Sequence, residues 1–123
     1  MQKMFKILVV EDTLVIREEL TDILSLEGYQ VFEADNGNIG FDVALKEAPN
    51  LIISDILMPE LDGFGMYKKL QTHNKTRIIP LIFLSAKAET EDITTGLNLG
   101  AKNYLTKPIN INILLNTIKT EEY

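Results

Sequence analysis

The chain has 123 residues, a formal net charge of −6 and no cysteine. Its length fits one domain over residues 1–123, and its acidic charge argues against direct binding to nucleic acid or anionic membranes, which need an excess of lysine and arginine. The absence of cysteine excludes disulfides and thiolate metal sites. The first apolar run, residues 5–10, is too short for a signal peptide or a membrane-spanning helix. We therefore expect a cytoplasmic protein without membrane insertion.

Strand and helix patterns alternate along the chain. Apolar or mixed short runs predict strands at residues 5–10, 30–34, 51–54, 81–84 and 102–105. Apolar residues at helical spacing follow each strand, in residues 16–24, 41–48, 66–70, 93–97 and 111–118. The second helix is expected to bury Ala48 and to stop at Pro49, and Asp62 is expected to cap the third helix.

Five such alternations without a hairpin signal predict a doubly wound α/β fold, with a five-stranded parallel sheet covered by helices on both faces. The strands at 5–10, 51–54 and 81–84 are wholly apolar and should be central, whereas the two mixed strands should lie at the edges. The predicted strand order is therefore 2-1-3-4-5, with strands numbered along the chain. In a sheet of this order the ligand crevice lies beyond the carboxyl ends of the first and third strands.

Chemically active residues follow the strands at that end of the sheet. Glu11 and Asp12 come after the first strand, Asp55 after the third, Ser85 after the fourth and Lys107 after the fifth. Three carboxylates in one crevice repel one another unless a cation joins them. An open site with only oxygen donors suits Mg²⁺.

The metal ligands and the reaction can both be proposed from these positions. We expect Asp12 and Asp55 to bind Mg²⁺ directly, together with the backbone carbonyl of Leu57, and Glu11 to act through water. An aspartate can attack phosphorus to form an aspartyl phosphate. One ammonium and one hydroxyl around the phosphoryl oxygens, here those of Lys107 and Ser85, would complete the site.

Several motifs occur in the order found in one known family. They are Glu11-Asp12, Asp55 with Met58-Pro59 and Asp62-Gly63, Ser85-Ala86, Gly100-Ala101, Tyr104 and Lys107-Pro108. In this combination the chain resembles, over essentially its whole length, the receiver domain of two-component response regulators. The resemblance is to the single-domain type found in chemotaxis regulators, whose fold is flavodoxin-like.

The resemblance implies a phosphorylation switch, and not a turnover enzyme. Asp55 would take a phosphoryl group from a histidine kinase, a histidine phosphotransfer protein or a small acyl phosphate, in the presence of Mg²⁺. Ser85 and Tyr104 would form a side-chain switch, and the peptide before Pro108 would be cis. The phosphorylated domain would act on an effector protein.

Three further positions carry expectations of their own. Ile113 lies opposite the apolar stripe of the last helix, and we expect the fourth helix, fifth strand and fifth helix to form a partner surface around it. Leu57 and Lys87 lie two residues beyond Asp55 and Ser85, where side chains can reach water that attacks the phosphoryl group. An apolar Leu57 predicts slow loss of that group.

Three other functions compete with the switch. A haloacid-dehalogenase-like phosphohydrolase shares the nucleophilic aspartate but needs a second acid where this chain has Leu57. A flavodoxin-like electron carrier needs phosphate-binding Thr, Ser and Gly where the chain has Glu11 and Asp12. A receiver that acts only as a phosphorylation-independent binding module is a further alternative.

Overall fold

A computed structural model describes residues 4–85, 98, 100–101 and 103–122 of the chain. Its centre is a five-stranded parallel sheet of order β2-β1-β3-β4-β5, which confirms the predicted order. The strands are β1 Lys6–Val10, β2 Gln30–Ala34, β3 Leu51–Asp55, β4 Leu81–Ser85 and β5 Asn103–Thr106. The last three thus extend one residue beyond the predicted strands at their carboxyl ends.

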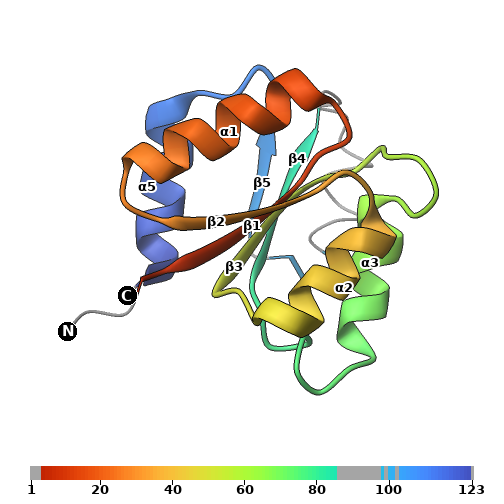
Figure 1. The fold of residues 1–123 in the computed structure, drawn as a ribbon. Coiled ribbons are helices and arrows are strands. Elements are labelled where there is room, and N and C mark those ends of the chain that lie inside the picture. Colours follow the sequence, from red (N-terminus) through yellow and green to blue (C-terminus); the bar gives the residue numbers. More distant parts are fainter. Residues whose placement is uncertain (1–3, 86–97, 99, 102, 123) are drawn as a thin grey trace.

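Helices cover both faces of the sheet (Figure 1). They are α1 Leu14–Leu26, α2 Gly37–Glu47, α3 Gly63–Gln71 and α5 Ile111–Glu122. Helices α1 and α5 pack on one face, and α2 and α3 pack on the other. The helix predicted around residues 93–97 lies outside the described residues. Within the described part of the chain, no helix is long and apolar enough to cross a membrane.

The central strands are buried on both faces because their side chains alternate between two apolar clusters. In β1, Ile7 and Val9 point toward α1 and α5, whereas Leu8 and Val10 point toward α2 and α3. The residues of β3 are likewise all buried, including the polar Ser54 and Asp55 at its end. The continuous apolar runs in the sequence therefore reflect strands that meet a helical layer on each side.

Polar side chains start two of the helices. Asn36 accepts a hydrogen bond from the Ile39 N–H at the start of α2, and Asp62 does the same for the Gly65 N–H at the start of α3. The prediction that Asp62 is an N-cap is confirmed. The prediction that Ala48 is buried was wrong: it has a left-handed backbone with φ of 49° and is exposed, because the chain leaves the helix there.

The loop between β3 and α3 packs tightly against the carboxyl end of β3. The Gly63 N–H donates to the Ile56 carbonyl at 2.7 Å. A Cβ atom at Gly63 would lie 2.2 Å from the backbone oxygen of Asp55, so this position has no room for a side chain. The close approach fixes where the loop that contains Leu57 leaves the strand.

Candidate functional site

Three carboxylates meet at the carboxyl end of the sheet. Glu11 and Asp12 follow β1, and Asp55 is the last residue of β3. One carboxylate oxygen from each side chain lies within 4.8 Å of the other two. Glu11 and Asp55 are buried, whereas Asp12 is exposed. Because parallel strands end at one edge, residues 44 positions apart in the chain become neighbours there.

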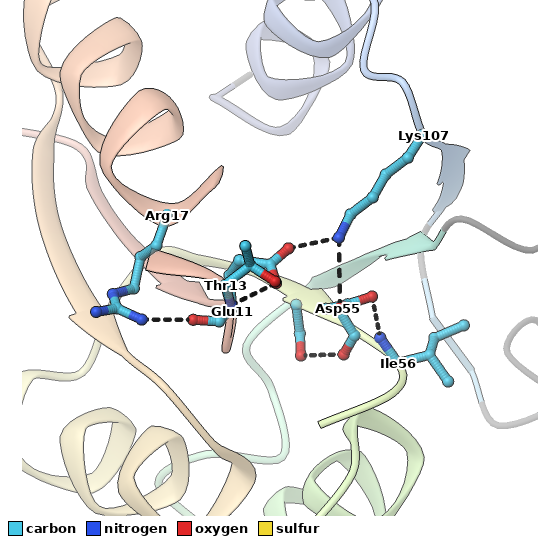
Figure 2. A network of polar contacts seen from close by, with 7 residues as sticks. Glu11, Thr13, Arg17, Asp55, Ile56 and Lys107 are labelled. Carbon is cyan, nitrogen blue, oxygen red and sulfur yellow. Dashed lines mark hydrogen bonds and ion pairs between the residues drawn. The ribbon is translucent and has the colours of Figure 1, made fainter. Parts of the chain in front are cut away.

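The ammonium group of Lys107, just beyond β5, lies between two of these carboxylates (Figure 2). Its Nζ atom is 2.6 Å from Glu11 Oε1 and 3.4 Å from Asp55 Oδ2. Burial by itself would lower the pKa of Lys107, but the hydrogen bond to Glu11 and the charges of Asp55 and Glu11 outweigh it and raise the pKa. Lys107 therefore carries its positive charge at neutral pH. The Lys107-Pro108 peptide is cis.

Glu11 is the most enclosed of the three acids. Burial raises the pKa of its carboxyl group, and the hydrogen bonds from Lys107 and from the Thr13 N–H offset only part of that effect. Both of its carboxylate oxygens are thus already in contact with donors of the protein. This arrangement fits a role for Glu11 at one remove from a bound cation.

Asp55 has one oriented and one available carboxylate oxygen. Its Oδ1 atom accepts the N–H of Ile56 at 2.8 Å, whereas Oδ2 faces Lys107 (Figure 2). Its backbone carbonyl accepts the Ser54 hydroxyl at 2.8 Å. These contacts fix the backbone and the side-chain orientation of Asp55, and they direct Oδ2 to the edge of the sheet.

The remaining sequence-predicted residues lie at different distances from this centre. Ser85 ends β4 beside Thr106 of β5, but its side chain and all of Lys87 lie outside the described residues. Leu57 is 55% exposed on the loop after β3. Tyr104 is half-buried in β5 against the cluster under α2 and α3, and Ile113 is 53% exposed on α5.

Arg17 is a polar residue of this region that the sequence analysis did not identify. Its Nη1 atom donates to the backbone carbonyl of Glu11 at 2.8 Å, and its Nε atom lies 3.1 Å from Glu33 Oε1 on β2. The sequence signal was an arginine in the first turns of a helix that directly follows an acidic pair. On its own that signal is weak, since most helical arginines are exposed.

The donor set of the site suits a small divalent cation. It offers carboxylate oxygens within 4.8 Å of one another and a side that is open at Asp12. Magnesium prefers oxygen ligands, keeps several waters and needs only one or two carboxylates from the protein. The residues present therefore fit Mg²⁺.

Comparisons with known proteins agree with this architecture. Residues 7–119 match the family described as response regulator receiver domain. Protein PilH of Pseudomonas aeruginosa is 38% identical over 115 residues, which cover 94% of this chain and 95% of PilH. The probable transcriptional regulator ycf27 of Porphyridium aerugineum is 41% identical over 103 residues, 84% of this chain but 42% of that protein. The high-resolution structure of the chemotaxis response regulator CheY4 of Vibrio cholerae is similar to this structure with a TM-score of 0.89 at 31% identity, and the match covers 97% of this chain and 99% of that chain.

A doubly wound parallel sheet of this strand order, with an acidic cluster and a lysine at its carboxyl edge, places the chain in the flavodoxin-like fold class. The chain belongs to the response regulator receiver domain family. It is thus a switch module of two-component signalling, and the haloacid-dehalogenase-like and flavodoxin-like alternatives are set aside. The chain spans nearly all of PilH but about two fifths of the ycf27 regulator.

The contact between Glu11 and Lys107 can be tested by a double-mutant cycle without divalent cations. Lys107→Met should destabilise the protein, because it leaves the buried Glu11 carboxylate without its ammonium partner. In a Glu11→Gln background the same change should cost less, with a coupling energy of about 1–3 kcal/mol. Urea denaturation of the four proteins measures this energy. Additivity within about 0.5 kcal/mol would show that the two groups do not stabilise each other.

Proposed function

We propose that Asp55 is the phosphoacceptor of this receiver domain. The observation that carries the proposal is the orientation of its carboxylate: Oδ1 is held by the Ile56 N–H, and Oδ2 faces Lys107 among the acidic residues. The phosphoryl donor would be the phosphohistidine of a histidine kinase or histidine phosphotransfer protein, and small acyl phosphates would serve as substitutes.

The transfer needs no general base. Asp55 attacks phosphorus as a carboxylate anion, an O–P bond forms, and the P–N bond of the phosphohistidine breaks. The imidazole leaves with the electron pair of that bond and keeps or takes up a proton. Lys107 then donates from Nζ to a phosphoryl oxygen, for which it only has to turn from Glu11, 2.6 Å away, toward Asp55. Ser85 ends the neighbouring strand, and we assign its hydroxyl to a second phosphoryl oxygen.

The acidic residues would hold the cofactor. Asp12 and Asp55 would bind Mg²⁺ directly with the backbone carbonyl of Leu57, and Glu11 would act through water. When bound, Mg²⁺ supplies positive charge that offsets the repulsion between the carboxylates and the incoming phosphoryl oxygens. The protein contributes the fixed positions of these oxygens, since Glu11 and Asp55 are both buried.

Phosphorylation would be passed on through the side of the sheet that contains β5. The phosphoryl group carries about −1.5 to −2 charge in place of the single charge of the carboxylate and brings three acceptor oxygens, which favours inward positions of Ser85 and Tyr104. We propose that this change reshapes the surface formed by the fourth helix, β5 and α5, and that an effector protein contacts Ile113 there. The domain would act through a change in which proteins bind to it, and it would gain and lose one phosphoryl group in each signalling cycle.

Intact-mass measurement tests the phosphoacceptor. Incubation with a small acyl phosphate and Mg²⁺ should add one phosphoryl group to the native chain, and Asp55→Asn should abolish the adduct. Asp62→Asn is the matched control, because it changes an aspartate on the same loop and asparagine caps a helix as well as aspartate does. Chelation of Mg²⁺ should prevent the adduct in every variant.

Two results of these measurements would contradict the proposed role of Asp55. A native chain that binds Mg²⁺ and is folded, yet gains no phosphoryl group from either an acyl phosphate or a phosphorylated phosphotransfer protein, would contradict the phosphoacceptor. The domain would then be a phosphorylation-independent binding module. An adduct that persists in Asp55→Asn would place the acceptor at another residue.

The lifetime of the phosphorylated state is expected to depend on Leu57. Its exposed apolar side chain cannot hydrogen-bond a water molecule that attacks phosphorus. Leu57→Asn supplies an amide, and one such hydrogen bond of about 1 kcal/mol corresponds to roughly fivefold faster dephosphorylation. The decay of the phosphorylated mass after removal of the donor measures the rate. Leu57→Met should leave it unchanged, and an equal rate in Leu57→Asn would show that this position does not limit hydrolysis.

The proposed partner surface should respond to phosphorylation. Addition of acyl phosphate and Mg²⁺ to isotope-labelled protein should shift the backbone amide resonances of Tyr104 and Ile113 more than that of Ile39, an exposed residue on α2. No shift should occur in Asp55→Asn. Changes confined to the loops around Asp55 would count against a switch that reaches β5 and α5.

A further inference from the structure

Arg17 links three segments around the acidic site without touching its carboxylates. It belongs to α1, its Nη1 atom reaches the backbone carbonyl of Glu11 after β1, and its Nε atom reaches Glu33 on β2. The side chain is only 15% exposed, whereas that of its partner Glu33 is 49% exposed. An arginine is seldom buried to this extent unless its guanidinium group is used.

The bond to the Glu11 carbonyl fixes one particular peptide unit. That carbonyl belongs to the same rigid plane as the N–H of Asp12, because a peptide bond does not rotate freely. The preceding peptide is fixed as well, since the Glu11 N–H donates to the Ala34 carbonyl at 3.0 Å. Together the two contacts hold the peptides on both sides of Glu11, so they set the direction in which the Glu11 side chain leaves the backbone and the place at which Asp12 begins.

Arg17 and Lys107 act on different parts of Glu11. Figure 2 shows Arg17 directed at the backbone carbonyl from one side, while Lys107 meets the carboxylate from the other. Arg17 therefore does not compete with a cation for the carboxylate oxygens. Its hydrogen bond to Glu33 limits the rotation of the guanidinium group and keeps Nη1 on the carbonyl.

We propose that Arg17 is a positioning residue that sets the Mg²⁺ affinity of the site by orienting the peptide between Glu11 and Asp12. The proposal rests on the function proposed above, in which these acids hold the cation. Groups that orient metal ligands, although they do not bind the metal, typically contribute a factor of about 10–100 to its affinity. Because Arg17 acts through the backbone, we expect a factor near the lower end of this range.

Calorimetric titration of the unphosphorylated protein with Mg²⁺ alone tests the proposal. Arg17→Met keeps the apolar stem of the side chain and removes the donors, and it should raise the Mg²⁺ dissociation constant about tenfold. Arg77→Met is the matched control. It removes the same charge from an exposed residue that precedes β4, near the amino ends of the strands and away from the acidic site. This change should leave the dissociation constant within about twofold of that of the native chain.

A second pair of measurements separates positioning from a purely structural role. Arg17→Lys keeps the charge but has no planar fork to reach both Glu11 and Glu33, so it should give an intermediate dissociation constant. Phosphorylation of Arg17→Met by an acyl phosphate should need more Mg²⁺ for half-maximal rate, while the rate at saturating Mg²⁺ should approach the native value. Loss of folding stability alone would not raise the Mg²⁺ concentration for half-maximal rate while it leaves the rate at saturating Mg²⁺ near the native value.

The outcomes distinguish this proposal from the one it rests on. A native chain that binds Mg²⁺, together with folded Arg17→Met or Arg17→Lys proteins of unchanged affinity, would overturn the role of Arg17 and leave the phosphoacceptor intact. A native chain that does not bind Mg²⁺ would overturn the proposed function and this inference with it. If Arg17→Met does not fold, the affinity of Arg17→Lys decides between the outcomes.

Discussion

The ammonium group of Lys107 is the interaction on which the acidic site depends. Glu11, Asp12 and Asp55 place carboxylate oxygens within 4.8 Å of one another, two of them on buried side chains. Two like charges about 4 Å apart near a protein surface repel by roughly 4 kcal/mol. In the described structure Lys107 contacts both buried acids and offsets part of this repulsion. Under the proposed function, the same group would donate a hydrogen bond to a phosphoryl oxygen.

The scaffold explains how such an unfavourable cluster is kept in position. Apolar side chains of β1 and β3 meet helices on both faces, so the two strands cannot shift without exposing core residues. Gly63 lies so close to the Asp55 carbonyl that no larger residue fits, and Arg17 holds the carbonyl of Glu11. The backbones of Glu11 and Asp55 are thus held in place, and Oδ2 of Asp55 faces Lys107 at the edge of the sheet.

A switch also requires parts that move more easily than this centre. The site lies at the edge of the sheet, and the side of the fold beyond it includes β5 and α5, where Tyr104 is half-buried and Ile113 is exposed. Under the proposed function, the aspartyl phosphate would carry about one more negative charge than the Asp55 carboxylate and three further acceptor oxygens, which can shift a population balanced within a few kcal/mol.

The sequence by itself determined the strand order and the meeting of Glu11, Asp12, Asp55 and Lys107 at one edge, because apolar runs mark central strands and parallel strands end together. The tertiary structure alone decided which donor serves which acceptor. The sharing of Lys107 between two acids and the reach of Arg17 to the Glu11 carbonyl depend on distances between segments set by sheet twist and helix packing, which local patterns do not encode. The helical periodicity likewise predicted that Ala48 would be buried. The tertiary structure exposes it, because the chain leaves the helix at this residue.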